Sequence, residues 1–215
     1  MVKGVIFDLD GTLLDTISDI HAVLNQTLAK FGYPLLSKER MIAYVGDGAR
    51  QLIMRSLPGK VPNEEEVFEY YTRTYANSEN ALTRPFDGAI EVLKRLSERG
   101  IKLAIVTNKP HGATERVVKQ YLSEIPFAFV AGDSGNFPVK PDPTLARFAA
   151  LTMRLFPEEC AFVGDGEPDA QTAINAGMFG ISCLWGYRSK EELEAVGATR
   201  FVSDFYELEK ILENS

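Results

Sequence analysis

The first regular element of the chain begins at Val5, in the stretch Val5-Ile6-Phe7-Asp8-Leu9-Asp10-Gly11-Thr12-Leu13-Leu14-Asp15-Thr16. Its three leading apolar residues predict a short, fully buried strand. Asp8 and Asp10 follow where that strand ends, and Gly11 permits a sharp change of direction. Residues i and i+2 of a strand share one face, so the two carboxylates can point the same way.

Two carboxylates that close together repel each other unless something separates their charges. A Mg²⁺ ion would do so, because it prefers hard oxygen ligands, and so would protonation of one carboxyl group. Either arrangement suits phosphoryl transfer, in which Asp8 attacks and Asp10 handles the proton. The alternative is a strand end followed by an ordinary Asp-Gly turn.

Composition narrows the class of protein. A chain of 215 residues can form one domain or two, and 45% hydrophobic residues allow a sizeable core. The net charge of −7 argues against nucleic-acid binding and against docking on an anionic membrane. No apolar run is long enough to span a bilayer and no signal-peptide pattern is present, so we expect a cytoplasmic protein.

Two residue types offer other chemistries that the sequence does not support. Cys160 and Cys183 each lie in an apolar run, which predicts buried thiols rather than a disulfide or a metal pair. His21 and His111 lie in or beside predicted helices, near no serine or cysteine motif, and are interpreted as structural or surface residues.

Residues 15–84 are predicted to be helical. Apolar residues recur at spacings of three and four from Ile17 to Phe31, the period of an amphipathic helix. Asn63 with Glu66 has the spacing of a capping box and predicts a later helix start. No convincing strand is found in this segment, which we interpret as an inserted helical cap domain.

From residue 85 onward, apolar strands alternate with helices. Strands are predicted at 101–106, 127–130, 161–164, 179–184 and 200–202. Such alternation is typical of a parallel sheet with helices on both faces. The predicted fold is therefore α/β, with a Rossmann-like core domain of residues 1–14 and 85–215 and an all-helical cap domain of residues 15–84.

Polar residues follow the carboxyl ends of four predicted strands. Open α/β sheets bind ligands outside those ends, where the strand order reverses. If the first strand is central, these residues converge on one site: Asp8 and Asp10, Thr107 and Asn108, Lys140, and Asp165 and Asp169.

The order of these segments resembles the four motifs of the haloacid dehalogenase-like superfamily, in its phosphatase branch. The resemblance covers essentially the whole chain. Its motifs are Asp8-x-Asp10-Gly11-Thr12-Leu13-x-Asp15-Thr16, Thr107-Asn108-Lys109, Lys140-Pro141-Asp142-Pro143 and Gly164-Asp165-Gly166-x-x-Asp169. Thr16 and Gly166 replace serines that are usual in the family. A dehalogenase of this superfamily would lack an aspartate at position 10.

The resemblance implies a role for each aspartate. Asp8 is the nucleophile that forms an aspartyl phosphate, and Asp10 is the general acid and base. Mg²⁺ is bound by the Asp8 side chain, the Asp10 main-chain carbonyl and Asp165. Asp169 binds the metal directly or holds the other ligands in place. Alternatively, Asp165 or Asp169 caps the following helix, and one of them can do both.

Three further residues are expected to stabilise charge on the transferring phosphoryl group, namely Thr107, the Asn108 amide and Lys140. Without the resemblance, Lys140 would be interpreted as a solvated loop lysine and Thr107 as a strand-end residue.

Three local patterns resemble the phosphoglycolate phosphatase-like group. They are residues 107–110, 45–49 and 185–198. They suggest 2-phosphoglycolate or another small phosphorylated acid, although pyrophosphatases and phosphatases of broad specificity share this group. Gly48 precedes a predicted helix start, which favours an anion, and Arg50 is positioned to add a carboxylate contact. Alternatively, this loop only connects two helices and Arg50 is solvated.

Two other functions remain open. A phosphosugar mutase resembling β-phosphoglucomutase would share the nucleophile, the acid and the cap. A receiver-like module would be phosphorylated on an aspartate without turnover, but it has no need of a cap that controls water. The expected partner is a small phosphorylated substrate, and neither nucleic acid nor a membrane is expected to bind. The protein is expected to be a monomer or a homodimer.

Overall fold

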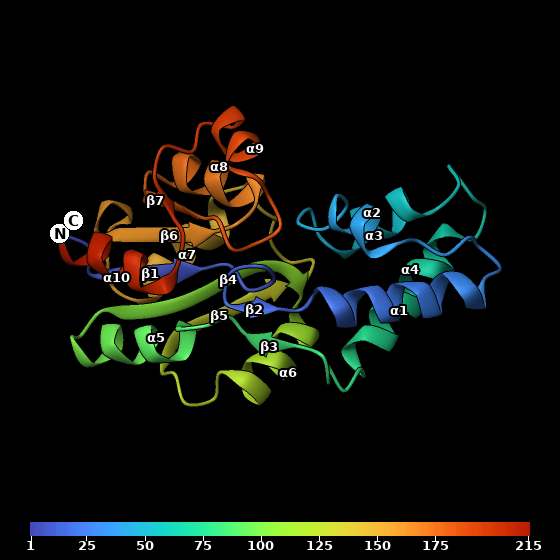
Figure 1. Cartoon of the computed structure of the whole chain (residues 1–215), viewed down its shortest axis with the longest axis horizontal. Coiled ribbons are helices and arrows are strands. Elements are labelled where there is room, and N and C mark those ends of the chain that lie inside the picture. Colours follow the sequence, from blue (N-terminus) through green and yellow to red (C-terminus); the bar gives the residue numbers. More distant parts are fainter.

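A six-stranded parallel sheet forms the centre of the computed structural model, which describes all 215 residues. The strand order is β5-β4-β1-β6-β7-β8, and each neighbouring pair is parallel. The central position predicted for the first strand is therefore confirmed (Figure 1). The strands are β1 (Gly4–Phe7), β4 (Lys102–Pro110), β5 (Phe127–Asp133), β6 (Cys160–Gly164), β7 (Phe179–Cys183) and β8 (Phe201–Val202).

Helices cover both faces of this sheet because its strands are apolar on both sides. Val5 and Phe7 pack with α5 and α10 on one face, while Ile6 packs with α7 and α8 on the other. The predicted α/β fold class is confirmed. The helices are α5 (Ala89–Glu98), α6 (His111–Tyr121), α7 (Thr144–Thr152), α8 (Glu167–Ala176), α9 (Lys190–Ala195) and α10 (Phe205–Glu213), with a 3₁₀ turn at Pro157–Glu159.

Four helices form the predicted helical insertion after the first strand, between the short strands β2 (Leu14–Asp15) and β3 (Arg84–Pro85). It lies beyond the carboxyl ends of the strands, on the right of Figure 1. A separate cluster of 15 buried apolar residues stabilises it, all from the insertion except Ala113 of α6. The helices are α1 (Ile17–Lys30), α2 (Lys38–Ile42), α3 (Ala49–Ser56) and α4 (Glu64–Ala76).

A two-stranded antiparallel ribbon joins the insertion to the sheet. Leu14 of β2 (Leu14–Asp15) pairs with Pro85, and Asp15 pairs with Arg84 of β3 (Arg84–Pro85). The expectation that no strand occurs between residues 15 and 84 was wrong at both ends of that segment. Each strand has only two residues, so no alternation of apolar and polar residues can reveal it.

The predicted capping box at the start of α4 is also wrong. Helix α4 does begin directly after Asn63, but the Asn63 side chain makes no capping hydrogen bond. Its Oδ1 instead accepts from the Tyr33 hydroxyl at 2.5 Å. Asn63 lacks the extended backbone conformation usual for a capping residue, so its side chain does not turn back to the helix.

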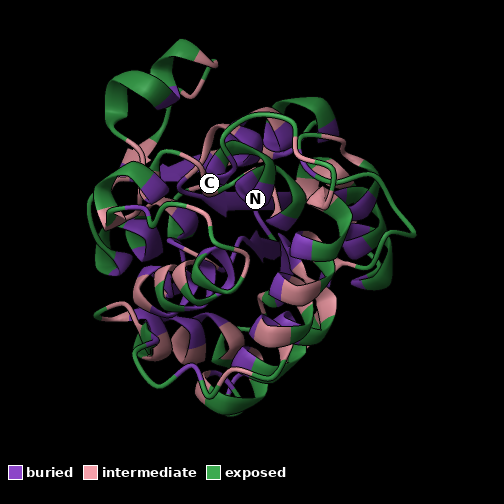
Figure 2. Cartoon of the chain, turned by 90° about the vertical axis from the view of Figure 1, so that its right-hand side faces the viewer, coloured by how far each residue is buried: buried purple, intermediate pink, exposed green.

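Buried residues are concentrated at the centre of the molecule, in the sheet and on the inward sides of the helices (Figure 2). Cys160 and Cys183 are both buried there as free thiols, as predicted. None of the helices is both long enough and apolar enough to cross a membrane.

Candidate active site

One cavity lies between the carboxyl ends of the strands and the helical insertion. The core lines it with Asp8, Asp10, Thr107, Asn108, Lys109, Pro110, Asp165, Gly166, Pro168, Asp169, Tyr187 and Arg188. The insertion contributes Ile20, Val45, Gly46, Gly48, Ala49, Leu52, Tyr71 and Tyr75. The cavity is therefore polar on the core side and largely apolar on the insertion side.

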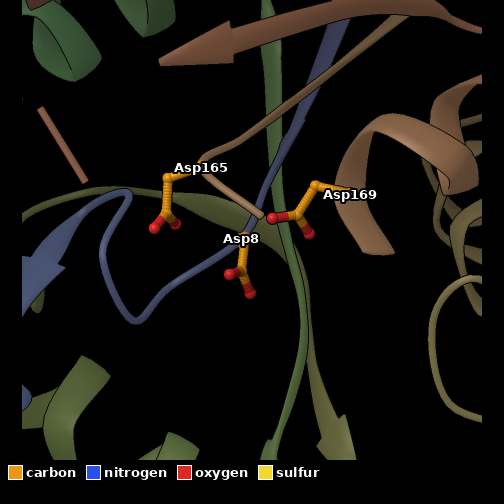
Figure 3. A group of neighbouring side chains, drawn as sticks. All are labelled: Asp8, Asp165 and Asp169. Carbon is orange, nitrogen blue, oxygen red and sulfur yellow. The ribbon is translucent and has the colours of Figure 1, made fainter. Parts of the chain in front are cut away.

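Three carboxylates meet at the core side of this cavity (Figure 3). Asp8 follows β1, Asp165 follows β6, and Asp169 lies in the first turn of α8. Each offers an oxygen atom, and these three atoms lie within 4.8 Å of one another. Sequence-distant residues meet here because β1 and β6 are neighbours in the sheet.

Hydrogen bonds fix two of these carboxylates. Asp165 accepts from the Thr12 hydroxyl at 2.8 Å and from the Tyr187 main-chain N–H at 2.9 Å. Asp169 accepts from the Gly166 N–H at 2.9 Å, so it also caps the start of α8. Asp169 therefore has the capping role that was expected for one of these two aspartates, and it also belongs to the carboxylate cluster.

The environment of the three carboxylates disfavours their shared negative charge. Burial, together with the charges of Asp169 and Asp8, raises the pKa of Asp165 to about 8. Burial and the charge of Asp8 likewise raise the pKa of Asp169 to about 6. Asp8 Oδ1 is buried and lacks an aligned hydrogen bond. A hard cation would offset the repulsion between the carboxylates and would bind the Asp8 oxygen that lacks a hydrogen bond. The three residues therefore fit a candidate metal site.

Lys140 lies beneath this cluster. Its ammonium is 2.7 Å from Asp8 Oδ1, outside hydrogen-bond alignment, and 2.5 Å from Asp169 Oδ1. Burial alone would lower the pKa of Lys140, but the charges of Asp169 and Asp8 outweigh that effect and raise it. Lys140 is therefore a buried, charged partner of both aspartates rather than a solvated loop lysine.

Asp10 faces a different cation. Lys109 donates to both of its carboxylate oxygens, at 2.8 and 3.0 Å, and also to the Tyr75 hydroxyl of α4. The Lys109 ammonium lies 4.4 Å from the centre of the Tyr75 ring. No role was predicted for Lys109, although its position directly after Thr107 and Asn108 was the available signal.

The predicted pair Thr107 and Asn108 is buried at the carboxyl-terminal part of β4. Thr107 lines the cavity, and its hydroxyl accepts from the Lys109 N–H at 3.3 Å. The Asn108 side chain accepts from the Lys140 N–H at 2.8 Å and donates to the Gly46 carbonyl at 3.1 Å. Asn108 thus connects the Lys140 loop to the insertion.

Of the two predicted insertion residues, the structure brings only Gly48 to the cavity. Gly48 has a positive φ of 90°, and a Cβ atom on it would lie 3.4 Å from the Asn108 carbonyl oxygen. Arg50 does not line the cavity: its side chain is 48% exposed and forms a bidentate pair with Glu65 at 2.8 and 2.9 Å. The expected Arg50 contact is therefore corrected, because Glu65 of α4 already occupies its guanidinium.

Two residues after β7 were not predicted as site residues. The Tyr187 hydroxyl accepts from the Thr16 N–H at 3.2 Å. Arg188 pairs with Glu167 at 2.8 Å and donates to the carbonyls of Ile42 and Val45 in the insertion, at 3.0 and 2.6 Å. Arg188, and not Arg50, is the arginine that lines the cavity.

Two glycines make room for Asp165. A Cβ atom on Gly11 would lie 2.3 Å from the Asp165 carboxylate, and one on Gly186 would lie 2.2 Å from its Cβ. Gly11 also has a positive φ of 86°. Any larger residue would displace the carboxylate, so both positions require glycine.

Comparison with known proteins agrees with this geometry. Residues 5–182 match the family model described as haloacid dehalogenase-like hydrolase. The chain belongs to the haloacid dehalogenase-like hydrolase family. As a member of this family it is an enzyme, and the resemblance drawn from the four motifs is confirmed.

Relatives within the family are phosphoglycolate phosphatase-like. Phosphoglycolate phosphatase 1 of Pseudomonas aeruginosa is 32% identical, over 95% of this chain and 77% of its own length. The phosphoglycolate phosphatase of Cereibacter sphaeroides is 36% identical over 87% of each chain. The crystal structure of a proposed phosphoglycolate phosphatase from Lactobacillus delbrueckii superposes with a TM-score of 0.88 at 29% identity, covering 98% of both chains.

Proposed function

We propose that this hydrolase is a Mg²⁺-dependent phosphomonoesterase that acts through an aspartyl phosphate on Asp8. The observation that carries the proposal is the position of Asp8, whose buried carboxylate faces the cavity beside Asp165, Asp169 and Lys140. This arrangement offers one nucleophilic oxygen and surrounds it with groups that handle charge. The names of the relatives support a phosphatase.

In the first step, an Asp8 oxygen attacks phosphorus, and the bond between phosphorus and the ester oxygen breaks. The electron pair of that bond goes to the leaving oxygen, which Asp10 protonates. In the second step, water attacks phosphorus, Asp10 accepts its proton, and the bond to Asp8 breaks. The presence of Asp10 in the same cavity as Asp8 supports this pairing of roles.

Mg²⁺ would be held by the Asp8 side chain, the Asp10 main-chain carbonyl and Asp165. When bound, it would neutralise the carboxylates and draw charge from the phosphoryl oxygens. Asp169 would hold Lys140 in place through their 2.5 Å contact. We assign the stabilisation of charge on the phosphoryl group to Lys140, the Thr107 hydroxyl and the Asn108 main-chain amide.

We further propose that residues 15–84 act as a cap domain over a core of residues 1–14 and 85–215. The separate apolar cluster of the insertion and the narrow β2–β3 ribbon support this division. The cap contributes the apolar wall of the cavity and limits the entry of water to the acyl phosphate.

The proposed substrate is a small phosphorylated acid such as 2-phosphoglycolate, as the names of the relatives suggest. The test is a panel of phosphate esters assayed for phosphate release with Mg²⁺, with EDTA as the control. Metal-dependent release from 2-phosphoglycolate is expected. Turnover only with a sugar bisphosphate present would favour a mutase, and a stable phosphoprotein without release would favour a receiver-like module.

A further inference from the structure

Three cationic side chains approach the cavity, and two of them have partners that leave them little freedom. Lys140 lies between Asp8 and Asp169. The guanidinium of Arg188 is shared among Glu167 and two main-chain carbonyls of the insertion. Lys109 differs from Lys140 in that it lines the cavity itself, and it donates to two cavity-lining side chains, Asp10 and Tyr75.

The Lys109 ammonium can donate one hydrogen bond to a ligand. An ammonium carries three N–H groups, and one is enough to hold the Asp10 carboxylate that now receives two. The side chain is only 1% exposed, so its charge acts at low dielectric. A ligand anion beside Asp10 would therefore meet a buried cation that is already oriented toward it.

Two tyrosines of α4 complete the polar surface around Lys109. The Tyr75 hydroxyl accepts from Lys109, so its own proton remains for another acceptor. Tyr71 is 2% exposed and stacks on Tyr75 with ring centres 5.7 Å apart. Tyr71 lines the cavity, and its hydroxyl forms no hydrogen bond within the chain. This free hydroxyl can donate to a ligand in the cavity.

We propose that Lys109, Tyr71 and Tyr75 bind the carboxylate of a substrate whose leaving alcohol is a 2-hydroxy acid. The inference rests on the proposed phosphatase function and names the residues that recognise the acid group. As general acid, Asp10 lies within hydrogen-bond reach of the ester oxygen. In a phosphorylated 2-hydroxy acid the carboxylate carbon is two bonds from that oxygen, which brings it to the Lys109 ammonium. This site replaces the contact expected from Arg50.

The test compares 2-phosphoglycolate with ethyl phosphate, which has a methyl group in place of the carboxylate. The quantity measured is the ratio of their kcat/KM values. We expect Lys109→Met to lower this ratio about ten- to hundredfold, the effect of one charge-assisted hydrogen bond. Tyr71→Phe lowers it about three- to tenfold. Tyr70→Phe is the matched control, because the neighbouring Tyr70 does not line this cavity, and the ratio stays at its wild-type value.

The ratio separates recognition of the acid from damage to catalysis, because loss of Asp10 positioning lowers both kcat/KM values together. Ratios in Lys109→Met and Tyr71→Phe equal to that of the wild type would overturn the inference. If the wild type hydrolyses neither ester, the proposed function fails on its own. Calorimetric Kd values for the same two esters then decide the inference, which is overturned if Lys109→Met weakens binding of both equally.

Discussion

Asp8 and Asp10 are two residues apart, yet each is paired with a different lysine. Asp8 lies 2.7 Å from Lys140, within the carboxylate cluster. Asp10 is held by Lys109, on the side of the insertion. Separate cations thus hold the two carboxyl groups in different surroundings, and we propose different roles for them, Asp8 as the nucleophile and Asp10 as the general acid and base.

Replacing Asp10 by asparagine should slow hydrolysis according to the leaving group. Asp10→Asn keeps a hydrogen-bonding side chain but cannot transfer a proton, so kcat for an alkyl ester falls about 10²- to 10⁴-fold. The loss is smaller for p-nitrophenyl phosphate, whose leaving group needs no protonation. Steady-state kinetics with both esters measure the difference, and equal losses would contradict the acid role of Asp10.

Asp165 should make the stability of the metal-free protein depend on pH. Its pKa is about 8 in the folded protein and about 3.9 in an unfolded chain, so folding favours the protonated form. The stability that it contributes is complete below about pH 4 and is lost as the pH rises through about 8. Asp169, with a pKa raised to about 6, acts in the same direction.

Thermal unfolding in EDTA at about pH 5 and about pH 8.5 tests this effect. The melting temperature should fall less between these two pH values in Asp165→Asn than in the wild type. The difference should be about 2–4 °C for each kcal/mol of pH-dependent stability that the Asp165 carboxyl group contributes. Added Mg²⁺ should stabilise the wild type most at the higher pH and should stabilise the variant little. An identical pH dependence in both proteins would rule out this role for Asp165.

At the scale of elements, the segment after β7 connects the sheet to the insertion. Arg188 lies in this segment and donates to the carbonyl of Ile42, the last residue of α2, and to that of Val45 in the loop before α3. Asn108, at the end of β4, donates to Gly46 in the same loop. The loop that lines the cavity is thus held by side chains at the carboxyl ends of the strands, which connects the position of the insertion to that of the sheet.

Removing the Arg188 side chain should loosen that loop. Arg188→Met leaves the Val45 carbonyl without a donor and the Ile42 carbonyl with only the Val45 N–H, at a cost of about 1–3 kcal/mol if the Val45 carbonyl stays buried. We expect faster amide hydrogen exchange at residues 42–48 and a kcat/KM about tenfold lower. Lys190→Met is the control, because its pair with Glu194 is exposed and contributes about 0–1 kcal/mol. Unchanged exchange at residues 42–48 would disprove the link.

At the scale of the whole molecule, strong apolar patterns explain why the fold was predictable. Buried strands such as β1 and β6 have nearly continuous apolar sequences, and the helices between them show a clear period. Carboxyl ends of parallel strands share one edge, so the convergence of Asp8 and Asp165 followed from strand order alone.

What the sequence could not predict depends on contacts between distant elements. Arg50 follows a helix start, as expected for an anion contact, but Glu65 of α4 takes its guanidinium. Lys109 and Arg188 become site residues only because the insertion folds over them. The spacing of residues along the sequence does not show which side chains pair between the insertion and the sheet. It also does not reveal a strand of only two residues, such as β2.

The central claim is that Asp8 carries the phosphoryl group during turnover. Acid quenching of the enzyme in the presence of Mg²⁺ and substrate, followed by borohydride reduction, converts an aspartyl phosphate to homoserine, which peptide mass spectrometry locates. We predict homoserine at position 8 alone, and none in Asp8→Asn, which should also lose turnover. Homoserine at another aspartate, or Asp8→Asn that still hydrolyses the ester, would contradict the covalent mechanism.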